Sequence, residues 1–150
     1  MELSTIIKVQ PTQVPLVWEL VKLAAVKSQE VAPEAFQSFC VQLLHNLLNG
    51  KAQCWVRYNE EGIVLSIQIT QICENGVMGV RELLIQGAYS FKLILEEEAI
   101  EQHRQWVAFA KATNCNRIVS YSSLPRSWQI SETMGWQPGH RQYVYLIGGE

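Results

Sequence analysis

Helically spaced apolar residues predict two helices early in the chain, after a first strand. Leu3 to Val9 is rich in isoleucine and valine and predicts that strand. A helix is predicted from about Val14. One face of it carries Leu16, Leu20, Leu23 and Ala24. Pro33 suits the first position of a second helix, which Asn49 and Gly50 end. Its apolar positions are Phe36, Phe39, Cys40, Leu43, Leu44 and Leu47.

The middle of the chain predicts three strands joined by two turns. The strands cover Ala52 to Tyr58, Ile63 to Ile72 and Val77 to Ile85. The second of them alternates between isoleucine or leucine and polar residues, which is typical of a strand with one buried face. The turns are Asn59 to Gly62 and Glu74 to Gly76, short enough for hairpins. These strands are therefore expected to be antiparallel neighbours.

Beyond Ile85 helices and strands alternate. We predict a helix over about Glu96 to Thr113, a strand over Arg117 to Tyr121, a short helix that ends at Met134-Gly135-Trp136, and a final strand over Gln142 to Ile147. The order β-α-α-β-β-β-α-β-α-β predicts an α+β fold with a mixed, mostly antiparallel sheet flanked by helices. We expect residues 1–150 to form a single domain.

Composition and charge exclude several classes of function. The chain has 12 lysines and arginines against 14 acidic residues, so it offers no basic surface for nucleic acid. No apolar run is long enough to cross a membrane, and the N-terminus has no secretion signal, so we expect a cytoplasmic protein. The four cysteines are widely spaced and predict no metal site. They are Cys40, Cys54, Cys73 and Cys115.

The second half of the chain resembles the GNAT (N-acetyltransferase) family. The run from Trp106 to Cys115 (WVAFAKATNC), followed by the strand from Arg117, resembles that family's long helix and next strand. Met134-Gly135-Trp136 is similar to the Gly-aromatic pair that closes its last helix. The pattern is most similar to small GNAT-like proteins encoded among the virion genes of tailed phages, with Trp128 in the place of a tryptophan in their last helix.

This resemblance implies a site for acetyl-CoA, but the chain departs from the family's loop for the pyrophosphate. The family uses Gln/Arg-x-x-Gly-x-Gly/Ala at a helix start, where backbone N–H groups and the helix dipole hold the anion. Here Glu96, Glu97 and Glu98 occupy the predicted helix start. The remaining candidate for a pyrophosphate turn is Gln86, Gly87 and Ala88.

The family's catalytic positions are also changed. Ser131 and Leu124 stand where the resemblance implies a tyrosine acid for the departing thiolate and an asparagine that assists it. Glu82, in the third middle strand, is the candidate base for the acceptor amine; the simpler interpretation pairs it with Arg81 at a solvent-facing edge.

Four residues are candidates for a protein interface. Trp128 and Arg126 are of the types that dominate binding hot spots. Tyr89 and Phe91 lie in an apolar segment that belongs to no predicted element. We therefore expect a protein partner or self-association.

Two functions fit these observations. The first is a GNAT-fold protein with a degenerate acetyl-CoA site, no cofactor and no metal, which acts as a binding or structural component of a phage virion or its assembly. In that case it is found in the virion; an adaptor unrelated to phage fits as well. The alternative is a divergent acetyl-CoA-dependent N-acetyltransferase of a small-molecule or protein amine.

Overall fold

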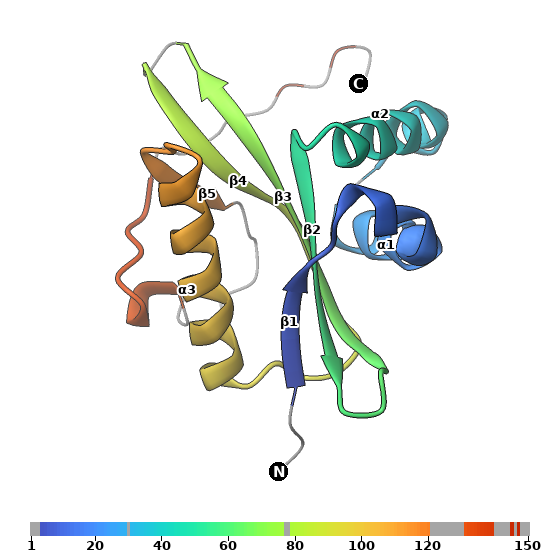
Figure 1. Ribbon diagram of the computed structural model, residues 1–150. Coiled ribbons are helices and arrows are strands. Elements are labelled where there is room, and N and C mark those ends of the chain that lie inside the picture. The colour runs from blue at the N-terminus through green and yellow to red at the C-terminus, as the bar shows by residue number, and fades with distance from the viewer. Residues whose placement is uncertain are drawn as a thin grey trace.

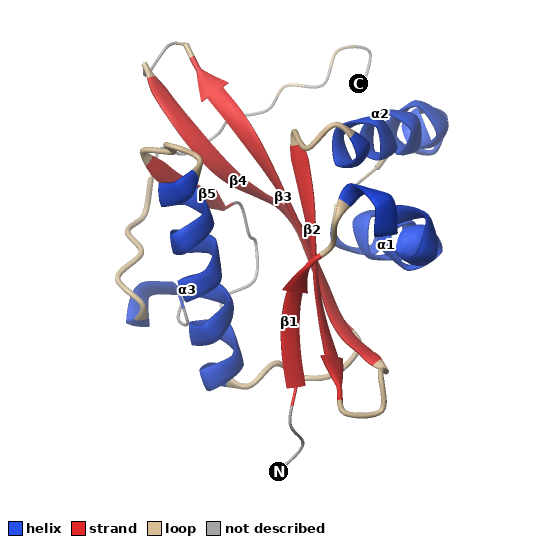
Figure 2. Cartoon of the chain, viewed as in Figure 1, coloured by secondary structure: helices blue, strands red, loops and turns tan. Residues whose placement is uncertain are grey.

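The computed structural model describes residues 4–29, 31–76, 79–120, 131–139, 145 and 147, in which a five-stranded sheet lies between two layers of helices (Figure 1). The elements are β1 (Ser4–Lys8), α1 (Val14–Ser28), α2 (Phe36–Leu48), β2 (Ala52–Asn59), β3 (Val64–Asn75), β4 (Val80–Ser90), α3 (Glu96–Ala112) and β5 (Arg117–Ser120). Single 3-10 turns, Pro11–Gln13 and Pro33–Ala35, precede α1 and α2. Helices α1 and α2 cover one face of the sheet and α3 covers the other (Figure 2).

The sheet has the order β1-β2-β3-β4-β5. Its first four strands are antiparallel neighbours, and β4 pairs with β5 in parallel. A parallel pair needs a crossover, and α3 is that connection. The α+β class and the mixed, mostly antiparallel sheet are confirmed, and the helix and strand order is confirmed as far as β5.

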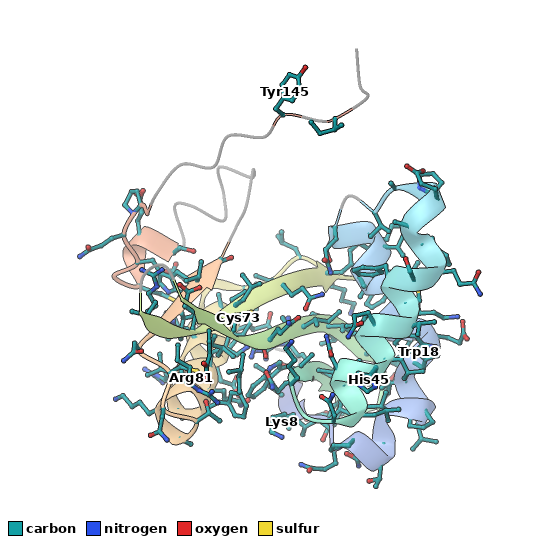
Figure 3. All side chains as sticks on the ribbon, turned by 90° about the horizontal axis from the view of Figure 1, so that it is seen from above. Lys8, Trp18, His45, Cys73, Arg81 and Tyr145 are labelled. Atoms are coloured by element: carbon teal, nitrogen blue, oxygen red, sulfur yellow. The ribbon has the colours of Figure 1, made fainter. Side chains whose placement is uncertain are left out.

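The apolar core lies between α1, α2 and one face of the sheet. The sheet contributes alternate residues, such as Cys54 and Val56 on β2 and Ile67 and Ile69 on β3. The helices contribute Val14, Val21, Ala24, Ala25, Leu43 and Leu47. Side chains fill the space on both sides of the sheet, with Trp18 and His45 on the α1 and α2 side (Figure 3).

The inward face of α1 differs from the prediction. Leu16 and Leu23 are exposed, with 85% and 41% of their surface accessible, whereas Val21 and Ala25 are fully buried. The leucine spacing that indicated the inward face follows a helical repeat, but several faces of this helix carry apolar residues. The small side chains face the sheet because they allow closer approach. On α2 the apolar positions Cys40, Leu43 and Leu47 are buried as predicted, but Phe36, predicted on the same stripe, is exposed.

The sheet face that α3 covers is largely polar on its two middle strands. It carries Gln53, Trp55 and Arg57 on β2 and Ser66, Gln68 and Thr70 on β3, all of them buried. Hydrogen bonds join part of this layer: Trp55 Nε1 donates to Thr70 Oγ1 at 3.0 Å, and Thr70 Oγ1 donates to Gln53 Oε1 at 2.7 Å. On α3 only Gln102 and Ala110 are buried, so Ile100, Trp106 and Val107, predicted to face inward, are only half-buried. The α1 and α2 face of the sheet is thus apolar. The α3 face is mixed, since Ile6 on β1 and Leu83 and Ile85 on β4 are also buried there.

The predicted ending of the last helix is present. Residues 131–133 are helical, and Gly135 follows with φ of 92°, a left-handed conformation that favours glycine. Trp136 N donates to the Ser131 carbonyl, and Gly135 N donates to the Glu132 carbonyl, each at 3.0 Å. This is the Schellman type of helix end. The predicted strand Gln142 to Ile147 lies largely outside the described residues, and Tyr145 and Ile147, which are described, are exposed.

Candidate active site

Strand β4 contains one extra residue, Gln86, near its middle. Ile85 lies opposite Thr70 and Gly87 lies opposite Ile69, so two neighbouring residues of β3 face three of β4. This is a β-bulge, which bends a strand and redirects a side chain, and bulges are frequent beside active sites.

The bulge directly follows the last described residue pair of β4 and β5. Within the described residues, β5 pairs with β4 only from Glu82 opposite Arg117 to Ile85 opposite Ser120. Strand β4 runs five residues further, from Gln86 to Ser90, toward the loop before α3. A strand edge without a partner presents N–H and C=O groups that an extended ligand can bind. Among the described residues, the Gln86–Ser90 segment of β4 therefore has a bulged edge that leads toward the start of α3.

The prediction that Gln86, Gly87 and Ala88 form a pyrophosphate turn is wrong, because all three lie within β4. The glycine between Gln86 and Ala88 indicated a loop, but packing explains why glycine stands at this position. A Cβ on Gly87 would lie 2.7 Å from Ser28 Oγ and 3.0 Å from Gln29 Nε2, so glycine lets the end of α1 rest on the strand. Ala88 is exposed.

The loop between β4 and α3 covers a pocket of about 220 Å³. Its walls are Arg57, Leu65, Ser66, Glu98 and the loop residues 92–95. Arg57 is only 2% exposed, and its Nε has no hydrogen-bond partner among the described residues. Glycine, which the family's phosphate loop uses, is absent from residues 91–95.

The three glutamates at the start of α3 differ in their surroundings. Glu98 Oε1 accepts a hydrogen bond from Leu95 N at 3.0 Å, and its Oε2 lies 3.3 Å from Arg57 Nη1. The carboxylate of Glu98 is therefore already paired with groups of the protein itself. Glu96 and Glu97 are exposed beside the first-turn N–H groups, which have no acceptor inside the helix. These two charges oppose a phosphate at the helix start, whereas Glu98 does not.

Glu82 is buried and forms a salt bridge across the parallel strands. It is 7% exposed, and Arg117 Nε donates to its Oε1 at 2.9 Å, with a second, short bond from Arg117 Nη2. The prediction that Glu82 forms a solvent-facing pair with Arg81 is wrong. Arg81 instead bonds Glu74 at 3.0 Å and the Thr113 carbonyl. The Glu82–Arg117 pair fastens β4 to β5 at the first of their described residue pairs. Its partner is 35 positions away, so no local sequence signal indicated it.

Ser131 lies on the α3 side, in the last helical turn before Gly135. That turn is anchored to α3, because Trp136 Nε1 donates to His103 Nδ1 at 3.0 Å. The two rings are 5.8 Å apart between centroids. Desolvation lowers the pKa of His103, which keeps the imidazole in the neutral form that accepts this bond. The structure thus positions Ser131 through the Trp136–His103 contact.

The cysteines are free thiols. Cys40 and Cys54 are buried, and Cys73 and Cys115 are half-buried. Burial raises the pKa of Cys54 to about 12 and also raises the pKa of Cys73. Since the thiolate is the reactive form, neither of these two is suited to act as a nucleophile at neutral pH.

The interface candidates have mixed outcomes. Trp128 and Arg126 lie outside the described residues. Tyr89 lies in β4 and packs against the apolar core, with its ring 5.1 Å from that of Phe91 and perpendicular to it. Phe91 is 40% exposed. Tyr89 is therefore a packing residue, which corrects its placement outside any element.

A pocket that the sequence did not indicate lies on the α2 side of the bulge. It has a volume of about 400 Å³. Its walls are Phe39, Gln42, Leu43, Asn46, Lys51, Gln71 and Gln86. These residues come from α2, the start of β2, β3 and β4, so only the fold brings them together. Gln86 is both the bulge residue and part of the wall.

The described residues contain neither a metal-binding cluster nor a membrane-spanning helix. No group of three or more histidine, cysteine or acidic side chains there is arranged to hold a metal ion. None of the helices in that part of the chain has the length and apolar content needed to cross a membrane.

Solved acetyltransferase structures share this fold, although no family model and no curated protein matches the sequence. A predicted acetyltransferase from Clostridium acetobutylicum with acetyl-CoA is similar with a TM-score of 0.73, at 14% identity over 97% of both chains. Ribosomal-protein-alanine N-acetyltransferase from Brucella melitensis has a TM-score of 0.67, at 13% identity over 97% of this chain and 100% of that one. Aminoglycoside N-acetyltransferase AAC(6')-Iy in complex with CoA has a TM-score of 0.69, at 13% identity over 99% and 97%.

These similarities concern the fold, because the identities are low. The chain has the GNAT fold of N-acetyltransferases.

Proposed function

We propose that this protein is a divergent acetyl-CoA-dependent N-acetyltransferase. The observation that carries the proposal is the edge of β4 from Gln86 to Ser90, which begins at a bulge, continues past the described pairing with β5 and leads to α3. Two of the similar structures hold acetyl-CoA or CoA. An extended thioester can lie along such an edge and bond its backbone, as an added strand does.

The reaction requires one new bond and one broken bond. The acceptor nitrogen joins the acetyl carbon, the C–S bond of the thioester breaks, the nitrogen loses a proton, and the CoA sulfur gains one. The fold contributes position, since it holds the two reactants at one bulge. Glu82 and Arg117 act by fastening β4 to β5. Ser131 remains the candidate near the departing sulfur.

The residues fit acetyl-CoA at the strand and only in part at the helix. The strand edge and the first-turn N–H groups of α3 supply the backbone donors that the thioester arm and the phosphates need. The loop lacks glycine, and Glu96 and Glu97 add negative charge beside those donors. We therefore expect weaker binding of acetyl-CoA than a glycine-rich loop gives.

Calorimetry with acetyl-CoA tests the proposal. We expect the natural protein to bind with a Kd within the range of roughly 1 µM to 1 mM that is usual for enzyme substrates. Ala88→Trp places a large ring on an exposed position of the β4 segment and should weaken binding at least about tenfold, a cost of about 1.4 kcal/mol. Gln37→Trp, on an exposed position of α2, is the control and should bind as the natural protein does.

A second readout tests catalysis. Release of CoA thiol should depend on an added amine and should fall in Ala88→Trp but not in Gln37→Trp. Absence of acetyl-CoA binding up to about 1 mM would contradict the proposal and return the fold to a scaffold role.

A further inference from the structure

We infer that the pocket between α2 and the bulge takes the acceptor, and that the acceptor is an amine that also carries peptide-like groups and a carboxylate. This inference rests on the proposed function, and it names the substrate class for the same site. Gln86 links the pocket to the bulge, because its backbone forms the bulge while its side chain lines the pocket. A ligand in the pocket therefore lies beside the point where we place the thioester.

Four carboxamide side chains characterise the pocket: Gln42, Asn46, Gln71 and Gln86. A carboxamide both donates and accepts, which makes it complementary to a peptide group. Gln86 Oε1 is buried and has no hydrogen-bond partner among the described residues. A buried acceptor without a partner costs stability, so a donor supplied by a ligand would bind there favourably.

Part of this amide set is already fixed in place. Gln42 Nε2 donates to Asn46 Oδ1 at 3.0 Å, one turn apart on α2. Asn46 is 7% exposed, an unusual burial for an asparagine on a helix. Phe39 and Leu43 supply an apolar wall from the same helix. The wall thus offers oriented polar groups and room for a small apolar side chain, as a small-molecule site requires.

The charge of the pocket selects against polycationic amines. Lys51 is the one charged residue in its wall, and it has no ion pair among the described residues. The nearby carboxylate of Glu82, which raises the pKa of Cys73 while Lys51 lowers it, is bound to Arg117. A polyamine would place its positive charges beside Lys51 with no carboxylate in the described wall to balance them, whereas a carboxylate would be attracted.

The volume agrees with a small ligand. About 400 Å³ lies in the range of roughly 300–1,000 Å³ typical of ligand pockets and suits one or two amino-acid residues. We therefore choose the dipeptide alanylglycine as the probe. Its amide, alanylglycine amide, lacks only the carboxylate, and spermidine represents the polycations.

The experiment measures binding of the three probes by NMR titration, and their acetylation by mass spectrometry. Alanylglycine should bind more tightly than its amide by about fivefold, the effect of one exposed ion pair, and spermidine should not bind. Lys51→Gln should remove the difference between the dipeptide and its amide. Gln86→Leu should weaken both by about tenfold, because a hydrogen bond is lost. Lys51→Gln should bind acetyl-CoA as the natural protein does, because Lys51 lies outside the β4 edge.

The outcomes separate the two proposals. Lys51-dependent binding of alanylglycine supports the pocket even in a protein that does not bind acetyl-CoA. Spermidine binding as tight as that of alanylglycine, or a preference for the carboxylate that survives Lys51→Gln, would overturn the inferred substrate class. Binding and acetylation of spermidine would do so while leaving the transferase proposal intact.

Discussion

Arg57 connects three elements from a nearly inaccessible position. Its Nη1 donates to Ser4 Oγ at 2.7 Å on β1, and its Nη2 donates to the Glu98 carbonyl at 2.9 Å on α3. Glu98 also receives a hydrogen bond from Ser4 Oγ at 3.1 Å. A buried charge is stable only when it is paired and hydrogen-bonded, and this set meets that condition for the start of α3.

Removing the cation from this network should destabilise the fold. Arg57→Met keeps an apolar stem of similar length but leaves the half-buried Glu98 without its partner, so we expect a loss of about 3 kcal/mol in the free energy of unfolding. Urea unfolding measures it. Lys22→Met, which removes the surface pair with Glu19, should cost under about 1 kcal/mol. Equal effects of the two substitutions would contradict this role of Arg57.

His103 should make stability depend on pH. Its pKa is lowered in the folded protein by desolvation, so the unfolded chain binds the proton more readily between the lowered pKa and the ordinary value of 6.5. The free energy of unfolding should therefore fall as pH falls through that window, and the bond from Trp136 should be lost. Thermal unfolding between about pH 5 and 7.5 measures this dependence.

Variants assign that pH dependence. His103→Gln should flatten the curve in this window, while His45→Gln, at an exposed position on α2, should retain it. A full slope in His103→Gln would show that another group is responsible.

At the level of elements, α3 is held to the sheet differently from α1 and α2. Gln102 is 3% exposed, and neither of its amide atoms has a hydrogen-bond partner among the described residues. Gln68 Oε1, on the sheet face that α3 covers, is also buried without a hydrogen-bond partner among the described residues. We expect α3 to exchange its amide hydrogens faster than α2, because it buries less apolar surface.

Gln102→Leu should stabilise the protein. The substitution removes two buried polar atoms without partners and adds apolar contact at similar volume, so a gain of about 1 kcal/mol is expected. The melting temperature reports it. Gln37→Leu, on the exposed surface of α2, should change stability by less than about 0.5 kcal/mol. A loss of stability in Gln102→Leu would show that this glutamine is satisfied, for instance by bound water.

The acidic start of α3 should limit affinity for acetyl-CoA. Replacing both Glu96 and Glu97 by glutamine removes two negative charges beside the first-turn N–H groups, and acetyl-CoA should bind up to about tenfold more tightly. Calorimetry at modest ionic strength measures it. The matched control replaces Glu60 and Glu61, exposed in the β2–β3 turn, with glutamine. Identical affinities in the two double variants would show that phosphate does not bind at this helix.

The elements that the sequence predicted best are those whose apolar pattern is local. Strands β1 to β3, helices α2 and α3 and the ending at Gly135 all follow from spacing within a single element. The end of β4 did not, because Gln86 to Ser90 has turn-forming and polar residues that indicate a loop. Its strand conformation comes from pairing with β3, and glycine at position 87 from the approach of α1.

The candidate site was predictable only in outline. The family resemblance indicated β4 and the start of α3, and both belong to the proposed site. The partner of Glu82 and the wall of the amide pocket depend on contacts between distant segments, which no pattern in a single sequence shows. The leucine-bearing face of α1 was wrongly predicted to point inward, because α1 carries apolar residues on several of its faces.

The two proposed sites lie on opposite sides of one bulge. On one side the edge of β4 leads to α3, and on the other the amide pocket lies under α2. In a transferase, this arrangement lets the thioester and the amine meet at Gln86 while the sheet separates the rest of the two molecules. The charge pattern divides in the same way, with glutamates at the helix start and Lys51 at the pocket.

The most direct test of this account is an NMR titration of the nitrogen-15-labelled protein with acetyl-CoA. The account predicts chemical-shift changes concentrated in the backbone amides of Gln86 to Ser90 and of the first turn of α3, with α2 outside the pocket unchanged. Calorimetry would then give the affinity of that same site. An absence of shifts at saturating acetyl-CoA, or shifts confined to residues away from β4, would contradict the central claim that this bulged edge binds the acetyl donor.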